Sequence, residues 1–266
     1  MNEAVYKMIL TQQEINHVLK LQAEAAAKGI TYKIDPGTNS GILCTRDGVP
    51  TGYMTVDCFG GHDIESAAIA GSTADWDCMK AVLTDYAREQ KATQILFICD
   101  PADTVVAKKL ESLGLKASFS EYRMEFAAAS FSPAAIQNIS LKKALASDAA
   151  YIKMLDEEVY GKDILCLSAA DLSNTLIILQ DNQPVGKLRT SAADGIYGIH
   201  GVAVESGLRG QGIGAQALTL LLNHYMSLGI QSIYLEVDSE NPAAFHLYKK
   251  LGFRVSSEFR YYPYAL

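Results

Sequence analysis

Two halves of this chain carry the same succession of sequence patterns, displaced by about 138 residues. Gln94–Asp100 and Ser232–Asp238 are both short β-prone runs, and each is followed by a helical pattern that ends at a Leu-Gly pair. The displacement is far longer than the period of a solenoid repeat, which measures roughly 20 to 50 residues. The pattern therefore predicts a duplicated α/β domain, and 266 residues are enough for two domains of ordinary size.

The second half contains a glycine-rich turn between a strand pattern, Ile199–Val204, and a helical pattern, Ile213–Leu228. The turn reads Arg209-Gly210-Gln211-Gly212-Ile213-Gly214-Ala215. This order is neither the dinucleotide-binding fingerprint nor a Walker loop. Backbone N–H groups at the start of a helix, the helix dipole and the charge of Arg209 all favour an anion, so the turn predicts a site for a diphosphate.

At the corresponding place the first half has Gly71–Trp76. Asp75 would repel a diphosphate, and Trp76 puts a bulky ring where a glycine would be needed. We therefore expect no anion site in the first half, and we expect Asp75 to cap the helix that follows.

Two motifs of the second half resemble the GNAT superfamily of acetyl-CoA-dependent N-acetyltransferases. The pyrophosphate loop of that family reads R/Q-x-x-G-x-G/A, and Arg209–Gly214 matches it. Ile233–Val237 is similar to the family's fifth strand, and Asn241–Phe253 is similar to the following helix with its Gly-Phe stop. The resemblance covers residues 139–266 and is weaker in the first half, which resembles a degenerate copy.

The resemblance implies an α/β (α+β) fold with two GNAT-like domains, each a mixed, mostly antiparallel twisted sheet flanked by helices. We expect a degenerate domain over residues 1–128 and an acetyltransferase domain with the acetyl-CoA site over residues 139–266. Small residues and a proline around residues 127–134 place a linker at residues 129–138.

The resemblance also implies which residues bind acetyl-CoA as co-substrate. In the family, the backbone of a splayed fourth strand binds the pantetheine arm and polarises the thioester carbonyl, which implies this role for Val202, Ala203 and Val204. The other implied acetyl-CoA-binding residues are Arg209, Gly210, Gln211, Gly212, Ile213, Gly214, Ala215, Asn241 and Ala244. Asn241 is equally suited to capping the next helix.

Tyr248 matches the family's general-acid tyrosine. A phenol is protonated at neutral pH, so its hydroxyl can protonate the departing thiolate. His200 is a candidate general base because of its intrinsic pKa, and the alternatives are a water chain and a histidine that is merely packed. The implied reaction is direct attack of an amine on acetyl-CoA, with a peptide N-terminus, a polyamine, an aminoglycoside or a small metabolite as acceptor. The alternative function is a regulatory module that binds acetyl-CoA or CoA without turnover.

The composition of the chain limits the classes of partner that we expect it to bind. A net charge of −7 argues against a non-specific nucleic-acid binder, and no apolar run reaches membrane-spanning length. The N-terminal residues lack the pattern of a secretion signal, so we expect a cytoplasmic protein, as a monomer or homodimer. The five cysteines are scattered and include no C-x-x-C pair, so we expect reduced thiols and no metal site.

Overall fold

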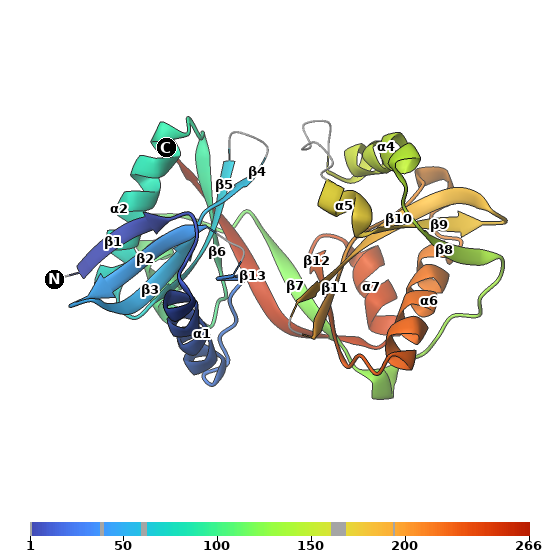
Figure 1. Ribbon diagram of the computed structural model, residues 1–266, viewed down its shortest axis with the longest axis horizontal. Coiled ribbons are helices and arrows are strands. Elements are labelled where there is room, and N and C mark those ends of the chain that lie inside the picture. Colours follow the sequence, from blue (N-terminus) through green and yellow to red (C-terminus); the bar gives the residue numbers. More distant parts are fainter. Residues whose placement is uncertain (1, 38–39, 60–62, 161–168, 194) are drawn as a thin grey trace. The chain divides into compact units, whose positions relative to one another are not determined.

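The computed structural model of the chain describes residues 2–37, 40–59, 63–160, 169–193 and 195–266. It divides into two compact units (Figure 1). The first unit consists of Met1–Glu121 and Ser257–Leu266, and the second unit consists of Tyr122–Ser256. Strands β7 (Phe119–Phe126) and β13 (Phe253–Ala265) each contribute residues to both units.

These units differ from the ranges expected from the sequence, 1–128 and 139–266. Residues 257–266 lie in the first unit, because Arg260–Ala265 of β13 pairs antiparallel with β6 of that unit. Residues from 122 onward, which include the expected linker 129–138, lie in the second unit. A strand pattern in a sequence says which residues alternate in burial but not which strand will be the neighbour.

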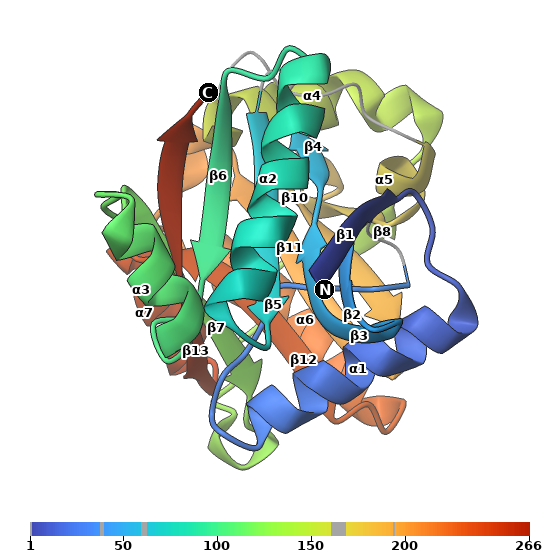
Figure 2. The ribbon, with the colours of Figure 1, turned by 90° about the vertical axis from the view of Figure 1, so that its left-hand side faces the viewer.

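The first unit places helices on both faces of its sheet. Its strand order is β1-β2-β3-β5-β6-β13, with β4 paired to β5. Leu43 packs with Val18 of α1, whereas its neighbours Ile42 and Cys44 pack with Trp76 of α2, so α1 and α2 cover opposite faces (Figure 2). The elements of this unit are β1 (Asn2–Lys7), α1 (Gln12–Ala26), β2 (Gly41–Arg46), β3 (Val49–Thr55), β4 (Asp57–Phe59), β5 (Asp63–Ala70), α2 (Thr73–Glu89), β6 (Gln94–Cys99) and α3 (Thr104–Ser112).

The second unit has the strand order β7-β12-β11-β10-β9-β8. Its core, which includes Ile178, lies between one face of the sheet and helices α6 and α7. Helix α4 lies over the opposite face (Figure 1). The elements of this unit are η1 (Ala128–Ser130), β8 (Ile139–Lys143), η2 (Ala146–Asp148), α4 (Ala149–Tyr160), α5 (Ala169–Ser173), β9 (Thr175–Gln180), β10 (Gln183–Ala193), β11 (Ile196–Val204), η3 (Ser206–Leu208), α6 (Ile213–Ser227), β12 (Ser232–Asp238) and α7 (Pro242–Lys250).

The two units repeat one succession of elements. The parallel pair β5–β6 with α2 between its strands, followed by α3, corresponds to the parallel pair β11–β12 with α6, followed by α7. β6 and β12 begin at residues 94 and 232, and α3 and α7 begin at 104 and 242, so each pair is displaced by 138 residues. Most other strand pairs are antiparallel. The predicted duplicated, mixed and mostly antiparallel α/β architecture is therefore confirmed.

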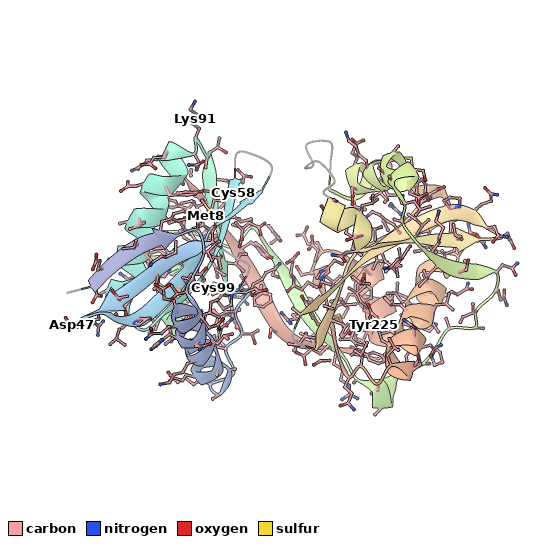
Figure 3. The ribbon with its side chains drawn as sticks, viewed as in Figure 1. Met8, Asp47, Cys58, Lys91, Cys99 and Tyr225 are labelled. Carbon is pink, nitrogen blue, oxygen red and sulfur yellow. The ribbon has the colours of Figure 1, made fainter. Side chains whose placement is uncertain are left out.

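Two hairpin tips explain the register of the flanking strands. Asp47 and Gly48 join β2 to β3 with φ of 52° and 79°, and Asp181 and Asn182 join β9 to β10 with φ of 49° and 65°. Two consecutive residues with positive φ form the tight turn whose twist suits an antiparallel hairpin. Figure 3 labels Asp47 at its tip.

Asp75 occupies the start of α2, but it is not the cap of that helix. Ser72 is the N-cap, and its hydroxyl accepts a hydrogen bond from the backbone N–H of Asp75. The Asp75 carboxylate is 1% exposed and accepts hydrogen bonds from Ser72, Thr51 and Arg46. The positive end of α2 thus faces a carboxylate of the chain itself.

Candidate functional site

A cavity of about 640 Å³ lies in the second unit, where the end of β11, the turn before α6 and helix α7 meet. It brings together most residues that the sequence assigned to acetyl-CoA and catalysis. Those that line it are Val202, Ala203, Val204, Arg209, Gly210, Gly212, Ile213, Gly214, Ala215, Asn241, Ala244 and Tyr248. Gln211 and His200 are not among the lining residues.

The glycine-rich turn forms one end of the cavity. Gly210 and Gly212 both have φ of 79°, a backbone conformation that side chains with a Cβ rarely adopt. Gly212 is the N-cap of α6, and its carbonyl accepts the hydrogen bond from Gln216 N that opens the helix. The first N–H groups of a 15-residue helix therefore lie at the cavity, as an anion site requires.

Arg209 is held at the rim by two contacts. Its Nε donates to the carbonyl of Val204 at 2.9 Å, and its Nη2 lies 3.1 Å from Oε2 of Glu158 on α4. Glu158 also lines the cavity. The guanidinium remains half exposed, so an anion that enters the cavity can reach it and would compete with Glu158.

The backbone at the middle of the cavity belongs to a strand that leaves its neighbour. β11 pairs with β12 from Ile196 to Ile199, while its pairing with β10 continues to Val204. The lining residues Val202, Ala203 and Val204 therefore lie beyond the point where β11 and β12 part. Backbone that is not committed to a β12 neighbour is suited to binding an extended ligand.

Helix α7 contributes Asn241 and Tyr248 from the same side of the cavity. Asn241 is the N-cap, and its Oδ1 accepts a hydrogen bond from Ala244 N at 3.1 Å. Tyr248 follows two helical turns later, is 7% exposed, and makes an edge contact with Phe253. The phenol thus sits in a mostly apolar wall of the cavity, next to Leu247 and Ala244.

His200 lies on β11 just before the lining residues, with different neighbours. Its Nε2 is 2.8 Å from Oγ of Ser191, and its ring meets Tyr234 edge-on at 5.8 Å. Tyr234 also carries the guanidinium of Arg123 3.8 Å above its ring, and Arg123 pairs with Glu236 at 3.9 Å. The sequence did not predict this series of polar and aromatic contacts. The role of His200 as general base stays a prediction.

A buried charged cluster behind β11 was also missed. Lys187 of β10 is fully buried, and its Nζ lies 2.7 Å from Oδ1 of Asp156 on α4. Arg189 donates to the same carboxylate at 3.1 Å. Burial would raise the pKa of Asp156, but hydrogen bonds from Arg189 and Lys187 hold it below its usual value. One signal was available, because Asp156 follows Ile152 and Leu155 at the spacing of a buried helical stripe.

The remaining expectations concern the cysteine thiols, a metal site and membrane-spanning segments. Cys44, Cys58, Cys78 and Cys99 are free thiols, and Cys166 lies outside the described residues. Within the described ranges, no group of three or more His, Cys, Asp or Glu side chains is arranged to hold a metal ion. No helix in that part of the chain is both long and apolar enough to cross a bilayer.

A family model matches most of the second unit, and two relatives match parts of the chain. Residues 144–253 match the model of the Acetyltransferase (GNAT) family. The uncharacterized N-acetyltransferase YobR of Bacillus subtilis is 34% identical over 88 residues, which are 33% of this chain and 36% of YobR. An uncharacterized protein of Mycobacterium leprae is 41% identical over 68 residues, 25% of this chain and 18% of that protein. The matches thus span well under half of these curated relatives.

Solved structures match over the whole chain. A GCN5-related N-acetyltransferase from Sphaerobacter thermophilus has a TM-score of 0.76 at 16% identity, with 98% of this chain and 95% of that chain covered. A tandem GNAT protein from the clavulanic acid biosynthesis pathway has a TM-score of 0.72 at 13% identity, with 100% and 98% covered. At such identities the likeness shows the fold, which is that of tandem GNAT proteins. Residues 144–253, which hold most of the cavity lining, are thus similar to the Acetyltransferase (GNAT) family, and the chain as a whole has the fold of tandem GNAT proteins.

Proposed function

We propose that the second unit is an N-acetyltransferase that moves an acetyl group from acetyl-CoA to a primary amine by direct attack in a ternary complex. The observation that carries the proposal is the cavity at the end of β11, where the glycine-rich start of α6, the part of β11 that has parted from β12 and Tyr248 of α7 lie together. The match of residues 144–253 to the GNAT family supports acyl transfer, and the similarity to YobR, an uncharacterized N-acetyltransferase, supports nitrogen as the acceptor atom.

The chemistry of the lining residues fits acetyl-CoA. The start of α6 and Arg209 supply the donors and charge that a diphosphate needs. Val202, Leu247 and Ala244 offer an apolar wall to the pantetheine arm, whose amides can bond to the β11 backbone. The cavity of about 640 Å³ is of the size that ligands of this class occupy.

The proposed reaction needs three events. The nitrogen of a neutral amine attacks the thioester carbonyl carbon, and a negative charge develops on the carbonyl oxygen, which backbone N–H groups of β11 stabilise. The C–S bond then breaks, and the thiolate takes the proton of the Tyr248 hydroxyl. The new amide nitrogen loses its extra proton to a base, for which His200 or a water chain is proposed, and Tyr248 is reprotonated from solvent.

The second candidate is a regulatory module that binds acetyl-CoA or CoA without turnover. The anion-binding turn alone would suit it equally well. The burial of the Tyr248 ring in the cavity wall, where its hydroxyl can serve a departing thiolate, favours the enzyme.

Calorimetric titration with acetyl-CoA, followed by a free-thiol assay with a panel of amines, tests the proposal. The panel contains a peptide N-terminus, a polyamine, an aminoglycoside and small amino metabolites. We expect one site per chain and thiol release that depends on one class of amine. Binding without release for the whole panel favours the regulatory module, and absence of binding contradicts both candidates.

Replacement of Gly212 by Asp tests the cradle at the start of α6. The variant places a negative charge at the proposed diphosphate site, so we expect acetyl-CoA affinity to fall at least about a hundredfold. Gly229→Asp is the matched control, because Gly229 ends the same helix with φ of 75° while Gly212 begins it with φ of 79°. Both variants carry the same backbone strain and charge, so equal affinities would contradict the assigned cradle.

A further inference from the structure

Lys187 makes an unusual contact with the strand that lines the cavity. Its ammonium group is fully buried and donates a hydrogen bond to the carbonyl oxygen of Gly201 at 3.1 Å, besides its 2.7 Å ion pair with Asp156. Gly201 directly precedes Val202, the first cavity-lining residue of β11. The cation therefore acts on the peptide group that enters the proposed thioester-binding backbone.

That peptide group belongs to a bulge. The register pairs Ala203 with Lys187 and His200 with Arg189, so three steps along β11 oppose two along β10. Gly201 has φ of 52°, the left-handed conformation that glycine supplies in such bulges. Bulges of this kind redirect a strand, and this one lies between the part of β11 that pairs with β12 and the part that lines the cavity.

The hydrogen bond from Lys187 to the Gly201 oxygen also affects the N–H group of Val202, which belongs to the same peptide. The C=O and N–H of one trans peptide point in opposite directions, and the described residues contain no cis peptide bond. The N–H of Val202 therefore points away from Lys187. A cation bonded to the Gly201 oxygen withdraws electron density from the peptide and makes the Val202 N–H a stronger donor.

We propose that Lys187 is a positioning residue of the acyl-transfer site, which fixes the Gly201–Val202 peptide and strengthens the Val202 N–H as a donor to the thioester carbonyl oxygen. This inference rests on the proposed function. Stability alone does not explain a lysine at this position. A buried ammonium group is costly to desolvate, and apolar replacements of buried ion pairs often leave the free energy of unfolding unchanged. The surrounding charges form a supporting frame, with Asp156 holding Lys187 and Arg189 holding Asp156.

Replacement of Lys187 by Met is the direct test. The variant removes the cation at similar side-chain length and leaves the Asp156 carboxylate paired with Arg189, so no buried charge loses its last partner. The informative readout is the infrared band of bound acetyl-CoA labelled with ¹³C at the thioester carbonyl. In the wild type we expect this band below its frequency in solution, and in Lys187→Met we expect it to return most of the way. Turnover should fall about ten- to a hundredfold, with CoA affinity changed less than about threefold.

Two further variants keep the test decisive. Lys142→Met is the control, because Lys142 pairs at 3.1 Å with Asp148, just before α4, and does not line the cavity. Its carbonyl band should equal that of the wild type. Lys187→Leu also removes the cation and should share the signature of Lys187→Met, which decides the matter if Lys187→Met does not fold.

The outcomes separate this inference from the proposed function. Wild-type protein that fails to bind acetyl-CoA overturns both. Wild-type protein that binds and shifts the carbonyl band, together with a folded Lys187→Met or Lys187→Leu that shifts it equally, overturns the role of Lys187 and leaves the acetyltransferase in place.

Discussion

At the scale of single residues, the proposed mechanism makes the phenol of Tyr248 the difference between an acetyltransferase and a module that only binds acetyl-CoA. Tyr248→Phe keeps the ring and its contact with Phe253 but removes the proton donor. We expect turnover to fall about a hundredfold with little change in acetyl-CoA affinity, since general acids contribute at least about that factor. Steady-state kinetics and calorimetry measure the two quantities.

Tyr225→Phe is the control for that variant. Tyr225 is as buried as Tyr248, at 6% against 7% exposed, and lies on α6 in the same unit without lining the cavity (Figure 3). Its replacement should leave turnover close to that of the wild type. A fully active Tyr248→Phe would assign the proton to another group.

Replacement of Glu158 should make acetyl-CoA binding tighter rather than weaker. Its carboxylate pairs with Arg209 and lines the cavity, so it would compete with the proposed diphosphate for Arg209. We expect Glu158→Gln to bind acetyl-CoA about two- to fivefold more tightly at low salt, because half-exposed ion pairs contribute up to about 1 kcal/mol, and to lose this advantage at high salt. Glu157→Gln, next to it on α4, breaks only a solvent-exposed pair with Lys153 and should not change affinity. Weaker binding by Glu158→Gln would contradict the competition.

At the scale of elements, α4 depends on ionised carboxylates. A hydrogen bond from the Leu145 backbone lowers the pKa of Asp148 before the helix, and hydrogen bonds from Arg189 and Lys187 outweigh burial to lower that of Asp156. A carboxylate with a lowered pKa in the folded state stabilises the fold above its unfolded pKa, near 3.8, and loses this contribution as the pH falls further.

Low pH should therefore remove the difference in thermal stability between the wild-type protein and Asp148→Asn. We expect the variant to unfold at a lower temperature near neutral pH, and the gap between the two midpoints to shrink as the pH falls below about 3.8 and Asp148 becomes protonated. Thermal unfolding followed by circular dichroism measures both midpoints. A gap that does not change with pH would exclude the ionised carboxylate as its source.

Local chemistry explains which elements the sequence could predict. Asp181 and Asn182 accept positive φ, so the β9–β10 hairpin could be predicted from them, and the helix start at Ile213 follows from the glycines before it. The cavity lining could be predicted because Arg209 to Ala215 and Asn241 to Tyr248 each lie on one contiguous motif. The contacts of Lys187 join β10, α4 and a bulge of β11, and no local pattern encodes such a meeting.

At the scale of the whole chain, the first unit is completed by β13. Arg260–Ala265 pairs with β6, and Tyr262 lies in the core beside Phe97. Deletion of residues 257–266 should expose β6 to hydrogen exchange, because the strand loses one neighbour and the unit loses the buried rings of Phe259, Tyr261 and Tyr262. Acetyl-CoA affinity should persist, since every cavity-lining residue belongs to Tyr122–Ser256.

Deletion of residues 265–266 alone is the control, since it keeps the pairs from Arg260 to Tyr264. Hydrogen exchange followed by mass spectrometry compares the β6 peptides of the three proteins. Unchanged protection of β6 in the longer deletion would show that β13 adds little to the first unit.

The place of β13 also bears on how this protein is made. Domains of multidomain chains ordinarily fold in the order in which the ribosome delivers them. Here Met1–Glu121 emerges first, but its sheet waits for Ser257–Leu266, which emerges after all of Tyr122–Ser256. The first unit therefore completes its sheet only after the second unit has been synthesised, and until β13 has been translated the edge of β6 that pairs with it stays available to chaperones or to a β13 from another nascent chain.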